Sequence, residues 1–427
     1  MRRGDLLREL ACGGLLERLA PVYGPDAEKA AARLRELTLE FAETFPCADN
    51  DETWLFSTPG RTELGGNHTD HQRGRGLAGS VNLDTIACVV PNGSRTIRIK
   101  SRHHRMAEVK LDQLSLQGAE TGSSPALVRG VAARLAELGH AIGGFDAYTT
   151  TSVLRGSGLS SSAAFEVLVC TIMDHLFCGG RLSPVGLAQV GQYAENVYFG
   201  KPCGLLDQLS CAAGGVVAAD FRDPAVPEIR QVRVDLDREG YALCIVDTHA
   251  SHADLTEDYA AIPLEMGQVA AFFGRTVLGE VPFSDFSAAI PALRARCGDR
   301  AVLRAYHYYK EDQRVLLQQE ALERGDFGQF LRLVRQSGRS SYMYLQNVSN
   351  YRDSRNQCVA VLLAAAEELL EVEGACRVHG GGFAGTIQAF VPLPRLAAFR
   401  AGMEAVAGRG SCHVLSIRDT GSVLLVS

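Results

Sequence analysis

The feature that most constrains this chain is a glycine- and serine-rich stretch at residues 154–166, Leu-Arg-Gly-Ser-Gly-Leu-Ser-Ser-Ser-Ala-Ala-Phe-Glu. A polar, β-prone run at 148–153 precedes it, and an apolar helical pattern continues to about His175. The stretch therefore lies where a strand gives way to the first turn of a helix. Unpaired N–H groups and the positive end of the helix dipole meet there, and glycines let another backbone or a phosphate come close.

Two interpretations fit this stretch. It is suited to hold phosphate, or it is a serine N-cap on an ordinary core helix with a flexible approach. No Gly-Lys-Ser/Thr closes the loop, so it is not a P-loop, and the third glycine of the dinucleotide fingerprint is absent. The other segments of the chain must decide between phosphate binding and capping.

Length, charge and cysteine content restrict the number of domains, the partners and the cellular compartment. The 427 residues suffice for about two or three domains, and the net charge of −6 argues against nucleic-acid and anionic-membrane partners. No apolar run approaches the roughly 18 residues that cross a bilayer. The twelve cysteines include no Cys-x-x-Cys pair, which is typical of reduced thiols, so we expect a cytoplasmic protein.

Two further segments combine glycine with polar residues, at 58–71 and 379–385. The first follows a short strand at 54–57, and its composition predicts a surface loop or a pocket wall. The second precedes a strand at 386–391. Helices are expected at 1–24 and at 27–45, where Leu34, Leu37, Phe41 and Phe45 share one face.

These three segments, together with Glu195 and the run Cys-Gly-Leu-Leu-Asp-Gln at 203–208, resemble the galactokinases within the GHMP group of small-metabolite kinases. The resemblance covers residues 30 to 427 in order. It implies an α+β fold of two domains with the active site in the cleft between them. We expect a helical extension at 1–26, an N-terminal kinase domain at 27–224 and a C-terminal domain at 225–427, because 223–227 reads as a linker.

The resemblance implies a catalytic pair and a metal site. Asp207 matches the acid that takes the proton from the anomeric hydroxyl of a sugar, and Arg61 matches the arginine that orients it. Ser162 and Glu195 match the Mg²⁺ ligands, with Glu166 a weaker alternative for the metal. This agrees with the chemistry, because phosphoryl transfer needs positioning and charge neutralisation more than covalent help.

The resemblance also implies two sets of binding residues. The sugar-binding residues are Asn67, His68, Asp70, Gly204 and Tyr259. The ATP phosphates are assigned to Gly156, Ser157, Gly158, Leu159, Ser160, Ser161, Ser162, Gly381 and Gly382. Arg155 could also meet phosphate, whereas His249 and His252 have no metal partner at suitable spacing.

The sugar segment departs from the family. Asn67 replaces the glutamate that grips the C6 hydroxyl of the sugar in galactokinases, and His71 replaces a tyrosine. Leu154 stands where proline is common before the phosphate loop, with little expected effect. Since an amide neither adds charge nor repels an anion, we expect Asn67 to relax the C6 preference, admitting a uronic, deoxy or amino sugar.

The expected function is ATP-dependent phosphorylation of the C1 hydroxyl of a monosaccharide, with galactose first, and with ATP and Mg²⁺ as the other small molecules. One alternative is a kinase for galacturonate, N-acetylgalactosamine or another related sugar. Another is a sensor that binds sugar and ATP without turnover. The intact serine run at 160–162 and the presence of both Arg61 and Asp207 favour catalysis.

Overall fold

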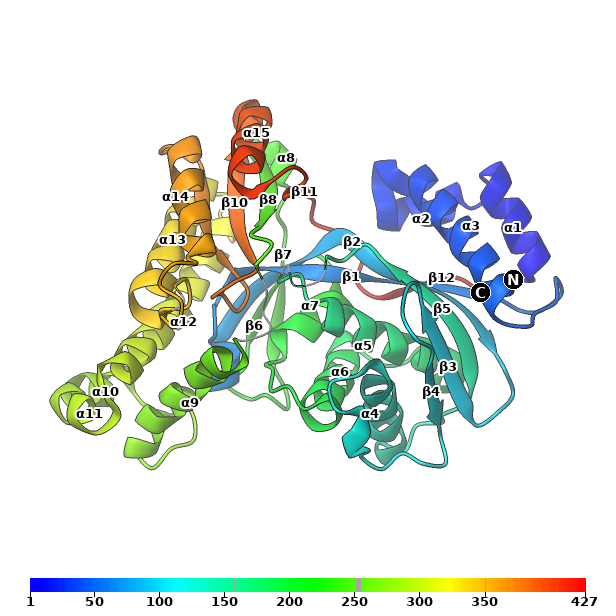
Figure 1. Cartoon of the computed structure of the whole chain (residues 1–427), viewed down its shortest axis with the longest axis horizontal. Coiled ribbons are helices and arrows are strands. Elements are labelled where there is room, and N and C mark those ends of the chain that lie inside the picture. The colour runs from blue at the N-terminus through cyan, green and yellow to red at the C-terminus, as the bar shows by residue number, and fades with distance from the viewer. Residues whose placement is uncertain (155, 157, 251–254, 350) are drawn as a thin grey trace.

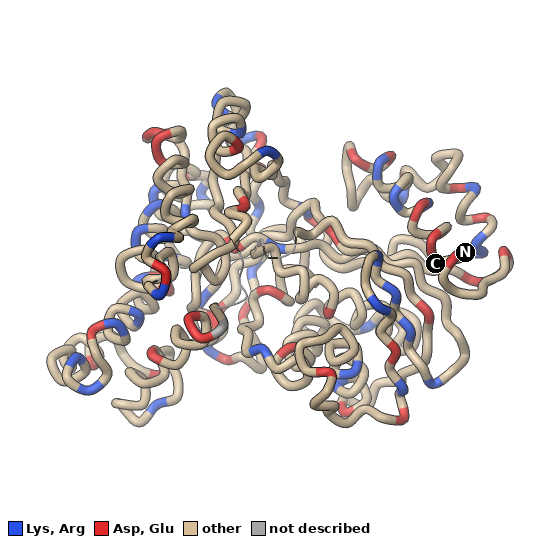
Figure 2. The backbone as a smooth tube through the Cα atoms, viewed as in Figure 1, with Lys and Arg blue, Asp and Glu red and all other residues tan. Residues whose placement is uncertain are grey.

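The structure is a computed structural model of the chain, and it describes every residue except 155, 157, 251–254 and 350. Two lobes lie side by side, and the long strands β1 and β2 extend between them (Figure 1). The two termini lie on the same side of the molecule. Acidic and basic residues are interspersed over both lobes (Figure 2).

The first lobe is built on an eight-stranded sheet with the order β12-β1-β2-β5-β3-β4, in which β6 pairs with both β2 and β7. Its pairs are antiparallel except β3 with β5. The strands are β1 (Trp54–Gly65), β2 (Arg75–Pro91), β3 (Thr96–Ser101), β4 (Ala107–Lys110), β5 (Phe145–Thr151), β6 (Val216–Asp220), β7 (Glu228–Val232) and β12 (Val423–Val426).

Helices cover both faces of this sheet (Figure 1). Alternation along the strands explains why, because neighbours such as Leu55 and Phe56 belong to different apolar clusters on opposite faces. One face packs against α1 (Arg3–Cys12), α2 (Leu16–Tyr23) and α3 (Ala27–Thr44). The other packs against α4 (Ser124–Glu137), α5 (Ser161–Met173), α6 (Pro184–Tyr193) and α7 (Leu206–Ala213).

Helix α3 confirms the helical pattern predicted for 27–45 up to Thr44: Leu34, Leu37 and Phe41 are buried on it, and Phe45, also buried, follows its end in extended conformation. Helix α5 is the core helix of the lobe. Among the described residues, the window Ser161–Cys178 is the one helical stretch long and apolar enough to cross a membrane, and 67% of it is buried inside the fold. Its apolar character is therefore accounted for by packing between the sheet and its neighbouring helices.

The second lobe holds a four-stranded antiparallel sheet with the order β11-β8-β10-β9. Its strands are β8 (Tyr241–Asp247), β9 (Ala375–His379), β10 (Thr386–Pro392) and β11 (Cys412–Leu415). The helices after residue 235 are α8 (Leu236–Glu239), α9 (Thr256–Phe272), α10 (Phe283–Ala288), α11 (Ile290–Cys297), α12 (Asp299–Glu323), α13 (Phe327–Ser340), α14 (Cys358–Leu370) and α15 (Leu396–Ala407).

The two lobes meet along β1, and here the expected short strand at 54–57 is too short. Of the two interpretations of 58–71, the surface loop is wrong for residues 58–65, and the pocket wall stays a prediction. Strand β1 continues to Gly65, and its residues from Leu55 onward are buried. The second lobe supplies partners for the buried polar groups of this strand. Gln388 of β10 donates through Nε2 to the Thr62 hydroxyl at 2.6 Å and to the Glu63 carbonyl at 2.9 Å. Polar residues can therefore be core residues here because their partners come from the other lobe.

Sheet membership also divides the chain differently from the expected boundary at 224/225. Strand β7 at Glu228–Val232 pairs with β6, and β12 at Val423–Val426 pairs with β1, so both belong to the first sheet. The chain thus crosses into the second lobe after β7 and returns at its end. The division into 27–224 and 225–427 stays a prediction.

Candidate active site

The centre of the site is an ion pair between Arg61 of β1 and Asp207 in the first turn of α7. Arg61 Nε lies 2.7 Å and Nη2 lies 2.5 Å from Asp207 Oδ1. Ser160 donates its hydroxyl to the other oxygen, Oδ2, and Arg61 Nη1 donates to the Gly158 carbonyl. The structure therefore brings together the predicted base, the predicted arginine and the glycine–serine loop.

The charges of this pair are fixed by their surroundings. Burial acts to raise the pKa of Asp207, but the Arg61 charge and the Ser160 hydrogen bond hold it below its usual value. Burial likewise works against the Arg61 charge, yet Asp207 raises the pKa of that guanidinium. The Arg61 side chain is 6% exposed and that of Asp207 is 35% exposed. The site thus presents an ionised carboxylate with one face open to solvent.

The glycine–serine loop is not an ordinary serine-capped helix start. Ser160 is the N-cap of α5, but its backbone is left-handed at φ 56° and its side chain caps no helix N–H, because its hydroxyl binds Asp207. Gly156 and Gly158 also have positive φ. Leu159 is buried, and Ser161 and Ser162 begin the helix. Ser157 and Arg155 lie outside the described residues.

The two predicted metal ligands lie together. Ser162 donates its hydroxyl to Glu195 Oε1 at 3.0 Å, and Glu195 is 2% exposed. Gln208 donates to Glu195 Oε2 at 2.8 Å and to Glu166 Oε2 at 3.1 Å. Burial first, and then the charge of Glu195, raise the pKa of Glu166 well above its usual value, which disfavours it as an anionic ligand.

This donor set suits a small divalent cation. One carboxylate with one hydroxyl, completed by phosphate oxygens and water, is typical of Mg²⁺, and the buried Glu195 carboxylate is paired here with the ammonium of Lys201. The described residues contain no group of three or more His, Cys, Asp or Glu that could hold a metal ion. A cation bound by Ser162 and Glu195 would take the phosphates of a nucleotide as further ligands and would bind more weakly without them.

Two of the predicted sugar-binding residues, Asp70 and Gly204, lie against each other. A Cβ added to Gly204 would lie 1.7 Å from Asp70 Oδ2, so only glycine leaves room for this carboxylate. Burial, with the charges of Asp207 and Glu63, raises the pKa of Asp70 to about 6. Asp70 and Gly204 are half-buried and lie in the loop after β1 and the turn before α7.

His68 belongs to a chain of hydrogen bonds that sequence reasoning missed. Gln72 Nε2 lies 3.3 Å from His71 Nδ1, His71 Nε2 lies 3.2 Å from His68 Nδ1, and His68 Nε2 lies 3.2 Å from the Gly381 carbonyl. Burial lowers the pKa of His68 to about 4 and that of His71 to about 3, so both rings are neutral. The amide of Gln72 can then donate into a chain that ends on the third glycine segment, and His71, in place of the family tyrosine, is its middle link.

Tyr259 and the third glycine segment pack on one another. The Tyr259 hydroxyl donates to the Gly382 carbonyl at 2.7 Å, and a Cβ on Gly381 would lie 2.5 Å from the Tyr259 ring. Gly380 also lies against the phosphate loop, since its added Cβ would be 3.4 Å from Gly158 Cα. The glycine segments of the two lobes therefore share one site. His252 lies outside the described residues.

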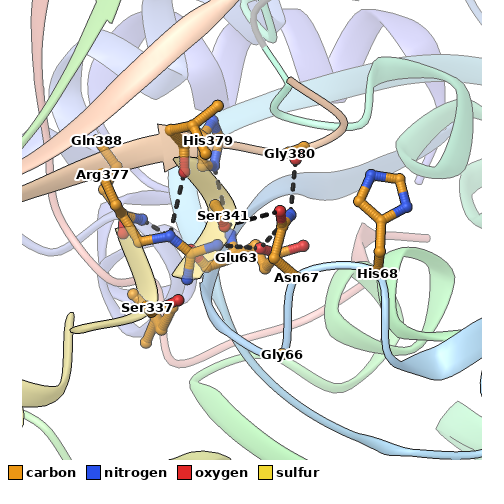
Figure 3. Close-up of polar contacts among 12 residues, drawn as sticks. Glu63, Gly66, Asn67, His68, Ser337, Ser341, Arg377, His379, Gly380 and Gln388 are labelled. Carbon is orange, nitrogen blue, oxygen red and sulfur yellow. Dashed lines mark hydrogen bonds and ion pairs between the residues drawn. The ribbon is translucent and has the colours of Figure 1, made fainter. Parts of the chain in front are cut away.

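Asn67 does not lie where the sequence placed it. Its Nδ2 donates to Glu63 Oε1 at 3.0 Å and to the Gly380 carbonyl at 2.7 Å, while Oδ1 accepts from Asn347 Nδ2 at 2.8 Å and Ser341 Oγ at 3.3 Å (Figure 3). The residue is fully buried, and all its hydrogen-bonding positions are used. Asn67 is an interface residue, in contrast with its expected contact to the sugar C6 hydroxyl.

Sequence reasoning also missed the cation that pairs with Glu63 at this interface. Arg377 of β9 is fully buried and its Nη2 lies 2.5 Å from Glu63 Oε1 (Figure 3). Burial raises the pKa of Glu63, while Arg377 acts to lower it. The signal in the sequence was that Glu63 lies in one glycine-rich segment and Arg377 lies just before another glycine-rich segment, 314 positions away.

Comparisons with known proteins agree with this geometry. Residues 126–215 match the family described as "GHMP kinases N terminal domain", and residues 39–91 match "Galactokinase galactose-binding signature". The galactokinase of Streptomyces coelicolor is 32% identical over 337 residues, which cover 78% of this chain and 83% of the relative. That of Streptomyces lividans is 32% identical over 333 residues, covering 77% and 79%.

Solved structures show the same fold. The crystal structure of Lactococcus lactis galactokinase complexed with galactose has a TM-score of 0.77 at 26% identity and covers 92% of this chain and 99% of that one. A mevalonate kinase structure has a TM-score of 0.59 at 12% identity, covering 86% and 99%. The fold and the site thus define a kinase of the GHMP group, as the resemblance of the glycine-rich segments, together with Glu195 and 203–208, predicted.

Within that group the family is also clear. The extent and identity of the match to the Streptomyces enzymes show that this chain belongs to the galactokinase family. It is a sugar kinase with a two-lobed α+β fold, which confirms the fold class and the enzyme class expected from the sequence. ATP is the co-substrate that membership of this kinase group implies.

Proposed function

We propose that the protein transfers the γ-phosphoryl group of ATP to the C1 hydroxyl of galactose, forming galactose 1-phosphate and ADP. The observation that carries the proposal is the Asp207 carboxylate, which Arg61 and Ser160 hold beside the glycine–serine loop. The names of the relatives, and the galactose in the Lactococcus lactis complex, support galactose as the sugar.

In the proposed reaction Asp207 accepts the proton of the C1 hydroxyl. The C1 oxygen forms a bond to the γ-phosphorus, the bond from that phosphorus to the β,γ-bridging oxygen breaks, and ADP leaves with the electron pair. Because Arg61 and Ser160 hold its pKa low, Asp207 is a weak base, and it contributes both by accepting the proton and by orienting the nucleophile. Arg61 keeps the carboxylate ionised and places positive charge beside the Gly158 carbonyl in the phosphate loop.

The first turn of α5 and the third glycine segment would hold the phosphates. Helix N–H groups attract phosphate oxygens. Gly380 keeps the third glycine segment close to Gly158, while Gly381 and Gly382 leave room for Tyr259 and Asn347. Ser162 and Glu195 would hold Mg²⁺, which supplies charge neutralisation of the triphosphate when it is bound. On the sugar side, Asp70 would accept hydroxyl hydrogen bonds, and Gly204 gives it room.

The described cysteines form no disulfide, and all twelve are free. Reduced thiols suit the proposed cytoplasmic location.

The experiment is a measurement of ADP release by the purified protein with ATP, Mg²⁺ and a sugar panel of galactose, galacturonate and N-acetylgalactosamine. Because Asn67 lies in the lobe interface, its amide supplies no reason for an altered C6 preference, and galactose should give the highest kcat/KM. A higher value for either other sugar would reassign the substrate. If the protein binds ATP and sugar but releases no ADP with any of the sugars, the result would instead support a non-catalytic sensor.

A further inference from the structure

Lys201 lies in the turn between the residues of the metal site and the catalytic aspartate. Gly200, with φ 84°, ends the helical segment that carries Glu195, and α7 with Asp207 begins five residues after Lys201. The backbone N–H groups of Gly200 and Lys201 both donate to the Glu195 carbonyl, at 3.0 and 3.1 Å. The start of the Lys201 side chain is therefore fixed next to Glu195.

The ammonium of Lys201 occupies the same carboxylate oxygen that a metal would use. Lys201 Nζ lies 3.1 Å from Glu195 Oε1, which also accepts the Ser162 hydroxyl at 3.0 Å. The other oxygen, Oε2, is taken by the Gln208 amide. A divalent cation that binds Glu195 and Ser162 must therefore compete with Lys201 for Oε1.

The side chain of Lys201 is free to move when this competition occurs. It is 62% exposed, whereas Glu195 is 2% exposed, so the lysine can turn while the carboxylate stays. Its charge also reaches the neighbouring acids, since it acts to lower the pKa of both Asp207 and Glu166. An ammonium released from Glu195 would thus remain near the phosphate loop, where the strongest anion is the triphosphate.

We infer that Lys201 is a second phosphate-binding cation, which pairs with Glu195 in the metal-free enzyme and turns to the triphosphate once a metal takes Glu195. The inference rests on the proposed function, because it requires ATP at the glycine–serine loop. The simpler interpretation is an exposed lysine whose ion pair contributes little. The two interpretations predict different changes in nucleotide affinity and in metal affinity when the ammonium of Lys201 is removed.

The test uses Lys201→Met, with Lys201→Arg as the conservative variant and Lys110→Met as a matched control on an exposed strand residue. Calorimetry with saturating Mg²⁺ measures the dissociation constant of MgATP. Paramagnetic resonance with Mn²⁺, in the absence of nucleotide, measures the dissociation constant of the metal.

In Lys201→Met, MgATP should bind about tenfold more weakly, since one hydrogen bond from the ammonium to the triphosphate is lost. Mn²⁺ alone should bind more tightly, because its competitor for Glu195 is gone. Lys201→Arg should restore ATP binding, and Lys110→Met should change neither constant.

Opposite changes in the two constants distinguish this role from a structural one, which would weaken both ligands together. Unchanged ATP affinity in Lys201→Met, or a parallel loss of both ligands, overturns the inference. Failure of the wild-type protein to bind ATP at all would instead overturn the proposed function.

Discussion

The buried position of Asn67 predicts a large and pH-dependent loss of stability in Asn67→Asp. The substitution keeps the shape of the side chain but replaces its donor group by a carboxylate oxygen. That oxygen would face Glu63 Oε1 at about 3.0 Å and the Gly380 carbonyl at about 2.7 Å, the distances that the amide nitrogen now spans. Two donated hydrogen bonds are lost and two carboxyl groups are brought into contact.

The magnitude follows from the cheaper of two responses. If both carboxylates stay ionised, their repulsion at about 4 Å costs about 4 kcal/mol for an effective dielectric constant of about 20. If the pair instead takes up a proton at pH 7, the cost is about 1.36 kcal/mol for each of about three pH units above the ordinary aspartate pKa, again about 4 kcal/mol. Either response removes a large part of the stability of a typical domain.

The sign of the pH dependence follows from the raised pKa of the carboxyl pair that Asn67→Asp would form with Glu63. An acid whose folded-state pKa is raised is penalised above its unfolded pKa, and the penalty grows with pH until the folded pKa is reached. The free energy of unfolding of the variant, relative to wild type at the same pH, should therefore fall by about 3 kcal/mol between pH 5 and pH 7.

Urea denaturation followed by circular dichroism at pH 5 and pH 7 measures this difference. Ser341→Ala is the control, since it removes only the 3.3 Å bond to Asn67 Oδ1 and should cost less than about 1 kcal/mol with no pH dependence. A difference between Asn67→Asp and wild type that is under about 1 kcal/mol at pH 7, or equal at both pH values, would refute the interface role of Asn67.

Three further predictions concern the reaction. Asp207→Asn should lower kcat at least about 10²-fold with an unchanged circular dichroism spectrum, while Asp237→Asn on the exposed helix α8 should leave kcat as it is. Arg61→Lys should lower kcat and move the acid limb of the kcat–pH profile to higher pH. The reason is that lysine cannot form the two-pronged contact of a guanidinium with Asp207, so the pKa of Asp207 should rise. An acid limb at the same pH as in wild type would show that Arg61 does not set this pKa. Gly204→Ala should raise the KM for sugar at least about tenfold by displacing Asp70, with the KM for ATP unchanged. Gly118→Ala, where an added Cβ meets nothing within 4 Å, is its control.

The parts of the site that sequence could predict are those whose chemistry is local. The glycine–serine loop is a strand-to-helix junction by composition alone. Asp207 and Glu195 were found because their positions match the galactokinase pattern. Their convergence followed from the family resemblance. The Arg61–Asp207 and Ser162–Glu195 contacts agree with it.

The failures come from contacts between residues far apart in the chain. The sequence shows that an amide replaces a glutamate at position 67, but not that Asn347 and Ser341, more than 270 positions away, would meet that amide. The same holds for β1, whose polar residues were expected in a surface loop or a pocket wall. They are buried because Gln388, Arg377 and His379 of the second lobe provide their partners.

The central claim is that Asp207 directs the C1 oxygen of the sugar to the γ-phosphorus of ATP. The most direct measurement is the ³¹P NMR spectrum of the product formed from galactose, ATP and Mg²⁺. We expect a single sugar phosphate whose phosphorus couples to the anomeric proton, and no such signal from Asp207→Asn over the same time. A phosphate on C6 or on any other carbon of galactose would contradict the account.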